Sequence, residues 1–488
     1  MPKTLSKSRH QTNSIMPTLD TPLPIEQHGL KLDTLFSHLQ GNILKGHGRP
    51  HTANIFIKFT ASANNVKNWL SNYASQITST KQQLKENKLF KEKDIKGGLF
   101  STVSISATGL KYLGLDINIP ALELSFKNGM KNAQIHDPLP SAWEQPFQQD
   151  ADALILLAYH DKVVLNETAD NLRADVAGIA DVLTTEEGHS LRNKNGDGIE
   201  HFGYMDGASQ PLFFKDELET FDKDNLPLSG FNPLAVKNLK QVLIADPFIT
   251  GSDTPDIDAY GSFLVFRKLE QNVKGFKLAE EELAIQLGLQ GEDAERAGAM
   301  IVGRFEDGSP VTLSDEDGMI GSGTLNAFNY SNDYRGDGKT DTNGSKCPFH
   351  AHIRKVNPRD GSEGIHVMGR RGIPYGKRED ESFENIDMMP KEGVGLLFQS
   401  YQSSITDQFE FLQETWANNK KFPIPNAGLD PIIGQSEEKK STGQFAAIWG
   451  DAGSFKTAEF SQFVTMKGGE YFFTPSIPFF NFIKNTSK

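Results

Sequence analysis

A single cysteine, Cys347, is present in the 488-residue sequence, so no intramolecular disulfide can form. The absence of disulfides fits a reducing compartment, and we expect a cytoplasmic protein. Long apolar runs are also missing, because no stretch reaches the roughly 18 apolar residues of a membrane span. Residues 1–20 lack both a twin arginine and an apolar run after their basic residues, which argues against a signal peptide.

Basic residues are in the minority. Lys and Arg number 50 against 63 Asp and Glu, and the formal net charge at pH 7 is −13. A nucleic-acid partner requires a basic face that displaces counterions, so this balance disfavours nucleic acid. The same acidity disfavours an anionic membrane surface and mainly promotes solubility.

The chain is nevertheless rich enough in apolar residues for two hydrophobic cores. Hydrophobic residues make up 37% of it, and 33 residues are Phe. A chain of this length exceeds one core, so we expect two domains. A polar composition predicts a disordered tail over residues 1–33. We place the two domains at 34–212 and 213–488, with the boundary just after Pro211.

The first domain has the pattern of an α+β module. Three runs predict strands, at residues 53–59, 99–106 and 153–160. Two stretches predict helices, at residues 64–77 and 166–183, the second with Leu172, Val176, Ile179 and Leu183 at helical spacing. Residues 190–207 then close the unit. The resulting order, strand–helix–strand taken twice, is that of a ferredoxin-like module with an antiparallel sheet and packed helices.

The second domain predicts a module of the same class, although no sequence repeat is visible. Strands are expected at 261–271 and 393–402, and helices at 278–300 and around Phe409, Leu412 and Trp416. Residues 462–475 predict a hairpin with a turn at its two glycines. A loop rich in Gly, Asp and Asn, residues 331–346, is long enough to indicate a functional or poorly ordered segment.

The first candidate site residue is Asp206, in the motif GYMDG. An aspartate between Gly203 and Gly207 lies where the backbone turns sharply, so its carboxylate can project into a cavity. The alternative is an ordinary turn aspartate, because Asp-Gly is a common turn dipeptide. The longer string HFGYMDGASQP favours a functional role.

The second candidate is His352, in the string CPFHAHIRKVNPR. On a helix, His350 would point about 200° away from it, so only one of the two could face a metal. On a strand both would share a face and a zinc site would be conceivable, but no third ligand follows at zinc spacing. Arg359 ends the string and suits pairing with carboxylates.

The third candidate is Arg370, in GRRGIPYG. If the segment is a strand, alternation places Arg370 and Arg371 on opposite faces, with one of them toward the pocket. The alternative for Arg370 is a surface position.

Residues 203–211, 347–359 and 370–376 resemble the signatures of the dye-decolorising peroxidases. Similar strings begin at Leu39, Gly261 and Gly395, and the resemblance extends over roughly residues 35–480. The length and long loops are similar to the larger subgroup of the family. The resemblance implies two ferredoxin-like domains around one non-covalent haem b per chain.

By motif position, the resemblance also implies roles for single residues. His352 would be the proximal iron ligand, with Asp430 accepting a hydrogen bond from its ring. Asp206 would transfer a proton between the peroxide oxygens and Arg370 would stabilise the developing negative charge. Three further residues would contact the haem: Arg359 at its propionates, and Leu396 and Phe398 as distal walls.

Bulky reductants cannot enter a closed haem pocket, so oxidation at surface aromatics is expected. Tyr375 and Trp416 match positions that the family uses for electron transfer, and packing is the alternative for each. An aspartate base, with a reference pKa of about 3.9 against about 6.5 for histidine, predicts that peroxide activation persists into acidic pH.

The sequence therefore predicts a haem peroxidase that reduces hydrogen peroxide and oxidises bulky aromatic, dye-like or phenolic compounds in one-electron steps. The main alternative is a haem-binding or haem-handling protein with incidental peroxidase activity, in which Asp206 would be dispensable. Covalent haem is not indicated, because the sequence has no Cys-x-x-Cys-His motif. A homodimer is compatible with these features.

Overall fold

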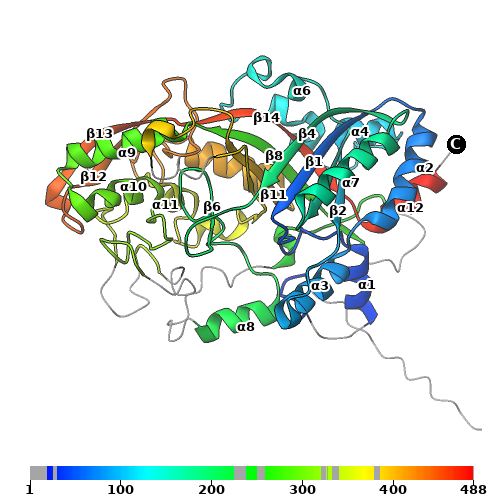
Figure 1. Ribbon diagram of the computed structural model, residues 1–488, viewed down its shortest axis with the longest axis horizontal. Coiled ribbons are helices and arrows are strands. Elements are labelled where there is room, and N and C mark those ends of the chain that lie inside the picture. Colours follow the sequence, from blue (N-terminus) through cyan, green and yellow to red (C-terminus); the bar gives the residue numbers. More distant parts are fainter. Residues whose placement is uncertain are drawn as a thin grey trace, which may run out of the picture.

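The computed structural model describes residues 19–25, 30–224, 238–249, 259–319, 326, 328–331, 340–378 and 385–486. Its centre is an antiparallel sheet that closes on itself (Figure 1). Starting from the short strand β7 (Ile244–Ala245), the strand order is β7-β8-β14-β2-β3-β1-β4-β10-β11-β9, and an additional pairing of β8 with β11 completes the ring. In the described part of the chain, no helix combines the length and apolarity needed to cross a membrane.

The first half of the chain forms the expected ferredoxin-like module. Its strands lie in the order β2-β3-β1-β4, with bounds β1 (His51–Phe59), β2 (Phe100–Ser106), β3 (Ala153–Tyr159) and β4 (Ala180–His189). Its main helices are α2 (Ala63–Tyr73), α3 (Thr80–Lys93) and α7 (Lys162–Asp175). Shorter helices are α4 (Ala107–Tyr112), α5 (Leu124–Asn128) and α6 (Gln145–Gln148).

The second half repeats this arrangement. The order β14-β8-β11-β10 corresponds to β4-β1-β3-β2 of the first module, with bounds β8 (Tyr260–Gln271), β10 (Ile373–Tyr375), β11 (Gly395–Gln402) and β14 (Val464–Thr474). Helices α9 (Val273–Leu287) and α10 (Glu295–Val302) follow β8, and π-helical segments Ile405–Glu410 and Leu412–Ala417 follow β11. The remaining elements that concern the site are β6 (Gly198–Ile199), β9 (Gly369–Arg370) and α11 (His352–Val356).

The two modules join edge to edge. Strand β4 pairs with β10 at Gly188 and Tyr375, and β2 pairs with β14 at Ser106 and Phe472. In Figure 1, α2, α4, α7 and α12 (Ile477–Asn485) lie at one end of the molecule and α9, α10 and α11 at the other. The expected division near residue 212 falls between β4 and β8.

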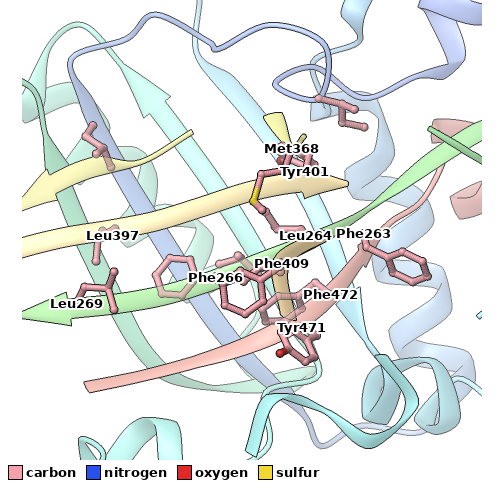
Figure 2. Close-up of a cluster of buried hydrophobic side chains, with 14 of the residues drawn as sticks. Phe263, Leu264, Phe266, Leu269, Met368, Leu397, Tyr401, Phe409, Tyr471 and Phe472 are labelled. Atoms are coloured by element: carbon pink, nitrogen blue, oxygen red, sulfur yellow. The ribbon is translucent and has the colours of Figure 1, made fainter. Parts of the chain in front are cut away.

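Aromatic side chains fill the interface between the modules. Phe56 of β1 packs edge-on against Phe266 of β8, with ring centroids 4.8 Å apart. Figure 2 shows Phe266 and Phe472 within this cluster. Each fully buried Phe contributes about 1.5–3 kcal/mol by leaving water. A polar contact crosses the same interface, because Gln399 Nε2 donates to Asn54 Oδ1 at 3.0 Å.

The expected tail, residues 1–33, falls partly outside the described residues, which begin at 19 and omit 26–29. Leu23 is buried and its N–H donates to the Phe213 carbonyl at 3.1 Å. Helix α1 (Leu30–His38) begins before residue 33. These described parts of the segment therefore contribute to the packed structure.

Two local predictions are wrong. The helix expected over 166–183 ends at Asp175, because Gly178 (φ +80°) turns the chain into β4. The hairpin expected over 462–475 is one continuous strand, β14, with a bulge between Met466 and Gly468. Its glycines serve close packing, since a Cβ at Gly468 would lie 2.2 Å from the Phe147 ring.

The helical segment expected over 278–300 is confirmed and consists of two helices, α9 and α10, which residues 288–294 separate.

Candidate active site

One large cavity lies beside the sheet of the second module and collects residues from all three sequence motifs. Asp206, His352 and Arg370 line it. Its floor includes two pairs of opposed residues on β8 and β11, Leu269 with Leu396 and Arg267 with Phe398. Because directly paired residues of neighbouring strands share a face, these four side chains lie on the same side of the sheet and form the floor together.

His352 is held by a buried carboxylate. Its Nδ1 lies 2.8 Å from Asp430 Oδ2, and Asp430 Oδ1 accepts the backbone N–H groups of Ile432 and Ile433 at 2.8 and 2.9 Å. Burial opposes both charges, but the charge and hydrogen bond that the pair share raise the pKa of His352 and lower that of Asp430. With Nδ1 engaged, Nε2 is the ring nitrogen left for a metal.

The short helix α11 that begins at His352 is fixed by two buried cations. Arg354 Nη1 lies 2.7 Å from Asp341 Oδ2. Lys355 Nζ donates to three carbonyl oxygens, those of Asn419, Phe422 and Gly428, at 2.9, 2.6 and 2.6 Å. The Lys355 contacts hold α11 to the segment that precedes Asp430, and the Arg354 contact holds it to Asp341.

Asp206 projects from a tight turn, as the flanking glycines predicted. Gly203 and Gly207 have φ of +102° and +79°, which L-residues rarely adopt. The N–H of Asp206 donates to the Gly198 carbonyl on β6 at 3.0 Å. Glu200 anchors the turn by accepting the N–H of Tyr204 at 3.1 Å. The Asp206 side chain is exposed at the cavity.

Arg370 and Arg371 lie on opposite faces, as strand alternation predicted. Arg370 is opposite Ser400 of β11 and lines the cavity, and its Nη2 lies 3.4 Å from the Ser209 carbonyl oxygen. Arg371 points away and donates to the Asn42 carbonyl oxygen at 2.7 Å.

Asp206, His352 and Arg370 interact electrostatically. Burial lowers the pKa of Arg370, and the Asp206 carboxylate acts in the opposite direction. Asp206 and Arg370 also act in opposite directions on the pKa of His352, behind the larger effects of burial and Asp430. The cavity therefore combines an imidazole, a carboxylate and a guanidinium whose charges influence one another.

Two buried arginines line the same cavity. Arg359 stacks on Phe328, with its guanidinium carbon 3.7 Å from the ring centroid, and its Nη1 donates to the Asn326 carbonyl oxygen at 2.6 Å. Arg304, which sequence reasoning missed, donates to Asn326 Oδ1 at 2.7 Å. Burial lowers the pKa of Arg304 to about 9.

The donor set fits haem b. His352 offers one ring nitrogen, the arginines suit carboxylate tails, and much of the wall is apolar: Ile353, Val356, Leu396, Phe398, Phe409, Leu412 and Ile432. A zinc site at His350 and His352 lacks support, because His350 is buried against Phe445 with ring centroids 4.7 Å apart. Among the described residues, no group of three or more His, Cys, Asp or Glu is placed to hold a metal ion.

The two residues expected to be surface aromatics are both buried, so that part of the prediction is wrong. Tyr375 is 7% exposed and Trp416 is 3% exposed. Tyr375 lies where β10 pairs with β4, opposite Gly188. Trp416 lines the cavity and stacks on Phe422, with centroids 5.1 Å apart and planes at 4°.

Sequence reasoning missed five titratable residues that line the cavity: Glu200, Tyr204, Arg267, Arg304 and His366. Tyr204 belongs to the string HFGYMDGASQP that carries Asp206, and Glu200 directly precedes it. Motif spacing does not show which side chains of a turn face a cavity, so only their adjacency to Asp206 was a signal.

Two family models match the chain. One, described as the DyP dimeric alpha+beta barrel domain, matches residues 38–192. The other, described as Dyp-type peroxidase, C-terminal, matches residues 230–422.

Individual relatives agree with the models. The chain is 40% identical over 468 residues to the multifunctional dye peroxidase DyP2 of Amycolatopsis sp., covering 91% of this chain and 95% of that protein. It is 33% identical over 410 residues to the dye-decolorizing peroxidase AauDyP1 of Auricularia auricula-judae, covering 77% and 74%. The crystal structure of the Anabaena sp. DyP-type peroxidase has a TM-score of 0.84 at 38% identity, covering 97% of this chain and 98% of that one.

Proposed function

The chain belongs to the dye-decolorising peroxidase family and is a haem peroxidase, and we propose that Asp206, Arg370 and His352 carry its peroxide chemistry. One observation carries the proposal: three segments far apart in the sequence bring these side chains to one cavity. When bound there, haem b supplies an iron that binds peroxide and accepts oxidising equivalents.

We assign the haem contacts as follows. His352 Nε2 would bind the iron, and the Asp430 carboxylate at Nδ1 makes the imidazole a stronger donor. Arg359 and Arg304 pair with the propionates, because guanidinium groups match carboxylates in charge and geometry. Leu396 and Phe398 line the cavity and would form an apolar wall on the distal side of the haem, where they would exclude water from the reacting oxygens.

Asp206 and Arg370 move charge during cleavage of the O–O bond. The Asp206 carboxylate takes a proton from one peroxide oxygen and returns it to the other, so that water leaves. The Arg370 guanidinium stabilises the negative charge that develops as the bond breaks. The Asp206 N–H donates to the Gly198 carbonyl oxygen, and the Arg370 guanidinium donates to the Ser209 carbonyl oxygen. These backbone contacts limit the reorganisation of both residues during the reaction.

The reductants that we propose are bulky aromatic, dye-like or phenolic compounds, each giving one electron. The names of the relatives point to dyes. Trp416, buried at the cavity and stacked on Phe422, supports a role in electron transfer from reductants that do not enter. We also propose a homodimer, because the matching family model is described as dimeric. A cytoplasmic location is proposed from the single cysteine, which is buried.

A haem peroxidase and a haem-handling protein can be distinguished by measuring both the rate of haem loss and the rate of peroxide turnover. Wild-type protein loaded with haem is mixed with excess apomyoglobin, and the rate of haem loss is compared with the turnover of peroxide and a phenolic reductant. The proposed function predicts slow loss and a turnover well above that of free haem. Rapid transfer with turnover no better than free haem would favour a haem-handling protein.

A further inference from the structure

Tyr204 connects the cavity to a cluster of buried charges. It is 5% exposed and lines the cavity two residues before Asp206. Its hydroxyl donates to Glu280 Oε1 on α9. The other oxygen of Glu280 lies 2.8 Å from Lys277 Nζ, which lies 2.6 Å from Glu306 Oε1. Glu306 is 46% exposed, so the chain of contacts leads from the cavity wall toward solvent.

The contact between the phenol and the carboxylate is built into the packing. A Cβ at Gly298 on α10 would lie 2.0 Å from Tyr204 Oη and 2.2 Å from Glu280 Oε1. A glycine therefore occupies the point where the two groups meet. The Tyr204 ring packs edge-on against Phe276, with centroids 6.2 Å apart and planes at 86°. The tyrosine has little freedom to leave this position.

Such a pair suits removal of an electron together with a proton. A phenol that loses an electron becomes a strong acid, so oxidation is much easier when a base already accepts its hydrogen bond. Burial raises the pKa of Glu280, with Lys277 acting against this effect. Glu280 is thus a better proton acceptor than an exposed carboxylate.

Tyr375 lacks this arrangement. Its hydroxyl is buried and has no hydrogen-bond partner in the part of the chain that the structure describes. A lysine ammonium lies near both rings, Lys268 at 5.1 Å from the centre of Tyr375 and Lys277 at 5.0 Å from that of Tyr204, so the two tyrosines differ in the proton acceptor and not in the neighbouring cation. A proton lost from Tyr375 has no acceptor comparable to Glu280.

We propose that Tyr204 is a redox-active residue of this peroxidase and that Glu280 is its proton acceptor, an inference that rests on the proposed function. Tyr204 gives one electron to the peroxide-oxidised cofactor, and its O–H proton moves to Glu280. The aromatic reductant then returns one electron to the Tyr204 phenoxyl group, and Glu280 returns the proton. The net change is one electron from the reductant to the cofactor, with Tyr204 and Glu280 restored.

The test is rapid freeze-quench electron paramagnetic resonance after one equivalent of peroxide, without reductant. Haem-loaded wild type is compared with Tyr204→Phe, Glu280→Gln and the matched control Tyr375→Phe. Incorporation of ring-deuterated tyrosine identifies tyrosyl signals by their narrowed hyperfine splitting. Each signal is scaled to the change in the haem absorption band of the same sample.

Loss of most of the tyrosyl signal in Tyr204→Phe, with the signal kept in Tyr375→Phe, is the expected result. Glu280→Gln is expected to lower the yield and to shift the g-value that reports hydrogen bonding to the phenoxyl oxygen. A tyrosyl signal that is undiminished in Tyr204→Phe, or absent in wild type, would overturn the inference. The proposed function would still stand in that case, provided that peroxide changes the haem absorption band of wild type. No absorption change in wild type would overturn both.

A second measurement needs no haem. Unfolding of the haem-free protein is followed for Tyr204→Phe, Glu280→Gln and the double variant. Non-additive effects are expected, because either single change removes the same hydrogen bond. Additive effects would show that the two groups do not interact, and would remove Glu280 as the proton acceptor.

Discussion

His352 Nδ1 and Asp430 Oδ2 lie 2.8 Å apart although 78 residues separate them in the chain. Asp430 is buried, and two backbone N–H groups hold its other oxygen. The carboxylate therefore fixes the orientation of the imidazole and increases its electron donation to a bound metal.

Asp430→Asn should lower peroxide turnover by about 10–100-fold, the usual effect of removing such a partner. The iron–histidine stretching frequency of the reduced haem protein should fall at the same time. A neutral amide lacks the negative charge of the carboxylate, so the imidazole donates less electron density to the iron and the bond weakens. Asp170→Asn, on the exposed face of α7, is the control. An unchanged stretching frequency in Asp430→Asn would contradict the assigned role.

Glu200 predicts a dependence of stability on pH. Burial raises its pKa from 4.5 to about 7, so the folded protein binds more protons than the unfolded chain between these values. Its contribution to stability is therefore fully present below pH 4.5 and is lost as the pH rises through 7. Relative to wild type, Glu200→Gln should gain stability between pH 5 and pH 8, by at most about 3 kcal/mol. Denaturant unfolding at the two pH values measures this, and a relative loss would contradict it.

Much of the architecture was predictable because several strands are locally distinct. The strands β1, β3, β8 and β11 carry alternating or continuous apolar runs. Strand β4 was missed because ADVLTTEEGH is largely polar and only partly buried. Ring closure depends on pairings such as Gly188 with Tyr375, which no local pattern specifies.

The candidate site was predictable to a similar extent. The chemistry-bearing Asp206, His352 and Arg370 lie in recognisable strings, and all three reach the cavity. The burial of Tyr375 was not predictable, because it depends on the joint between the modules. The contact of Tyr204 with Glu280 depends on how α9 and α10 pack, which spacing alone does not show.

Gly298→Ala should destabilise the protein by about 1–3 kcal/mol, as expected for an added methyl group in a packed interior. The new Cβ would lie 2.0 Å from Tyr204 Oη, so the hydroxyl must move. Chemical denaturation of the haem-free protein measures the loss. Gly364→Ala, where nothing lies within 4 Å of the added atom, is the control and should have a smaller effect.

Arg354→Met should cost about 3–5 kcal/mol, because it leaves the buried Asp341 carboxylate without its ion-pair partner. Unfolding by denaturant measures the change. Arg173→Met, which removes a largely exposed pair with Asp170, should change stability far less. Equal effects of the two substitutions would show that the Asp341 contact does not stabilise α11.

The most direct test of the account is the rate at which peroxide changes the absorption spectrum of haem-loaded Asp206→Asn, measured by stopped flow against wild type and Asp170→Asn. If Asp206 transfers the proton, its replacement should slow this step by about 10²–10⁴-fold, with haem binding retained. Asp170→Asn should react like wild type. A rate in Asp206→Asn equal to that of wild type would contradict the central claim that this cavity activates peroxide through Asp206.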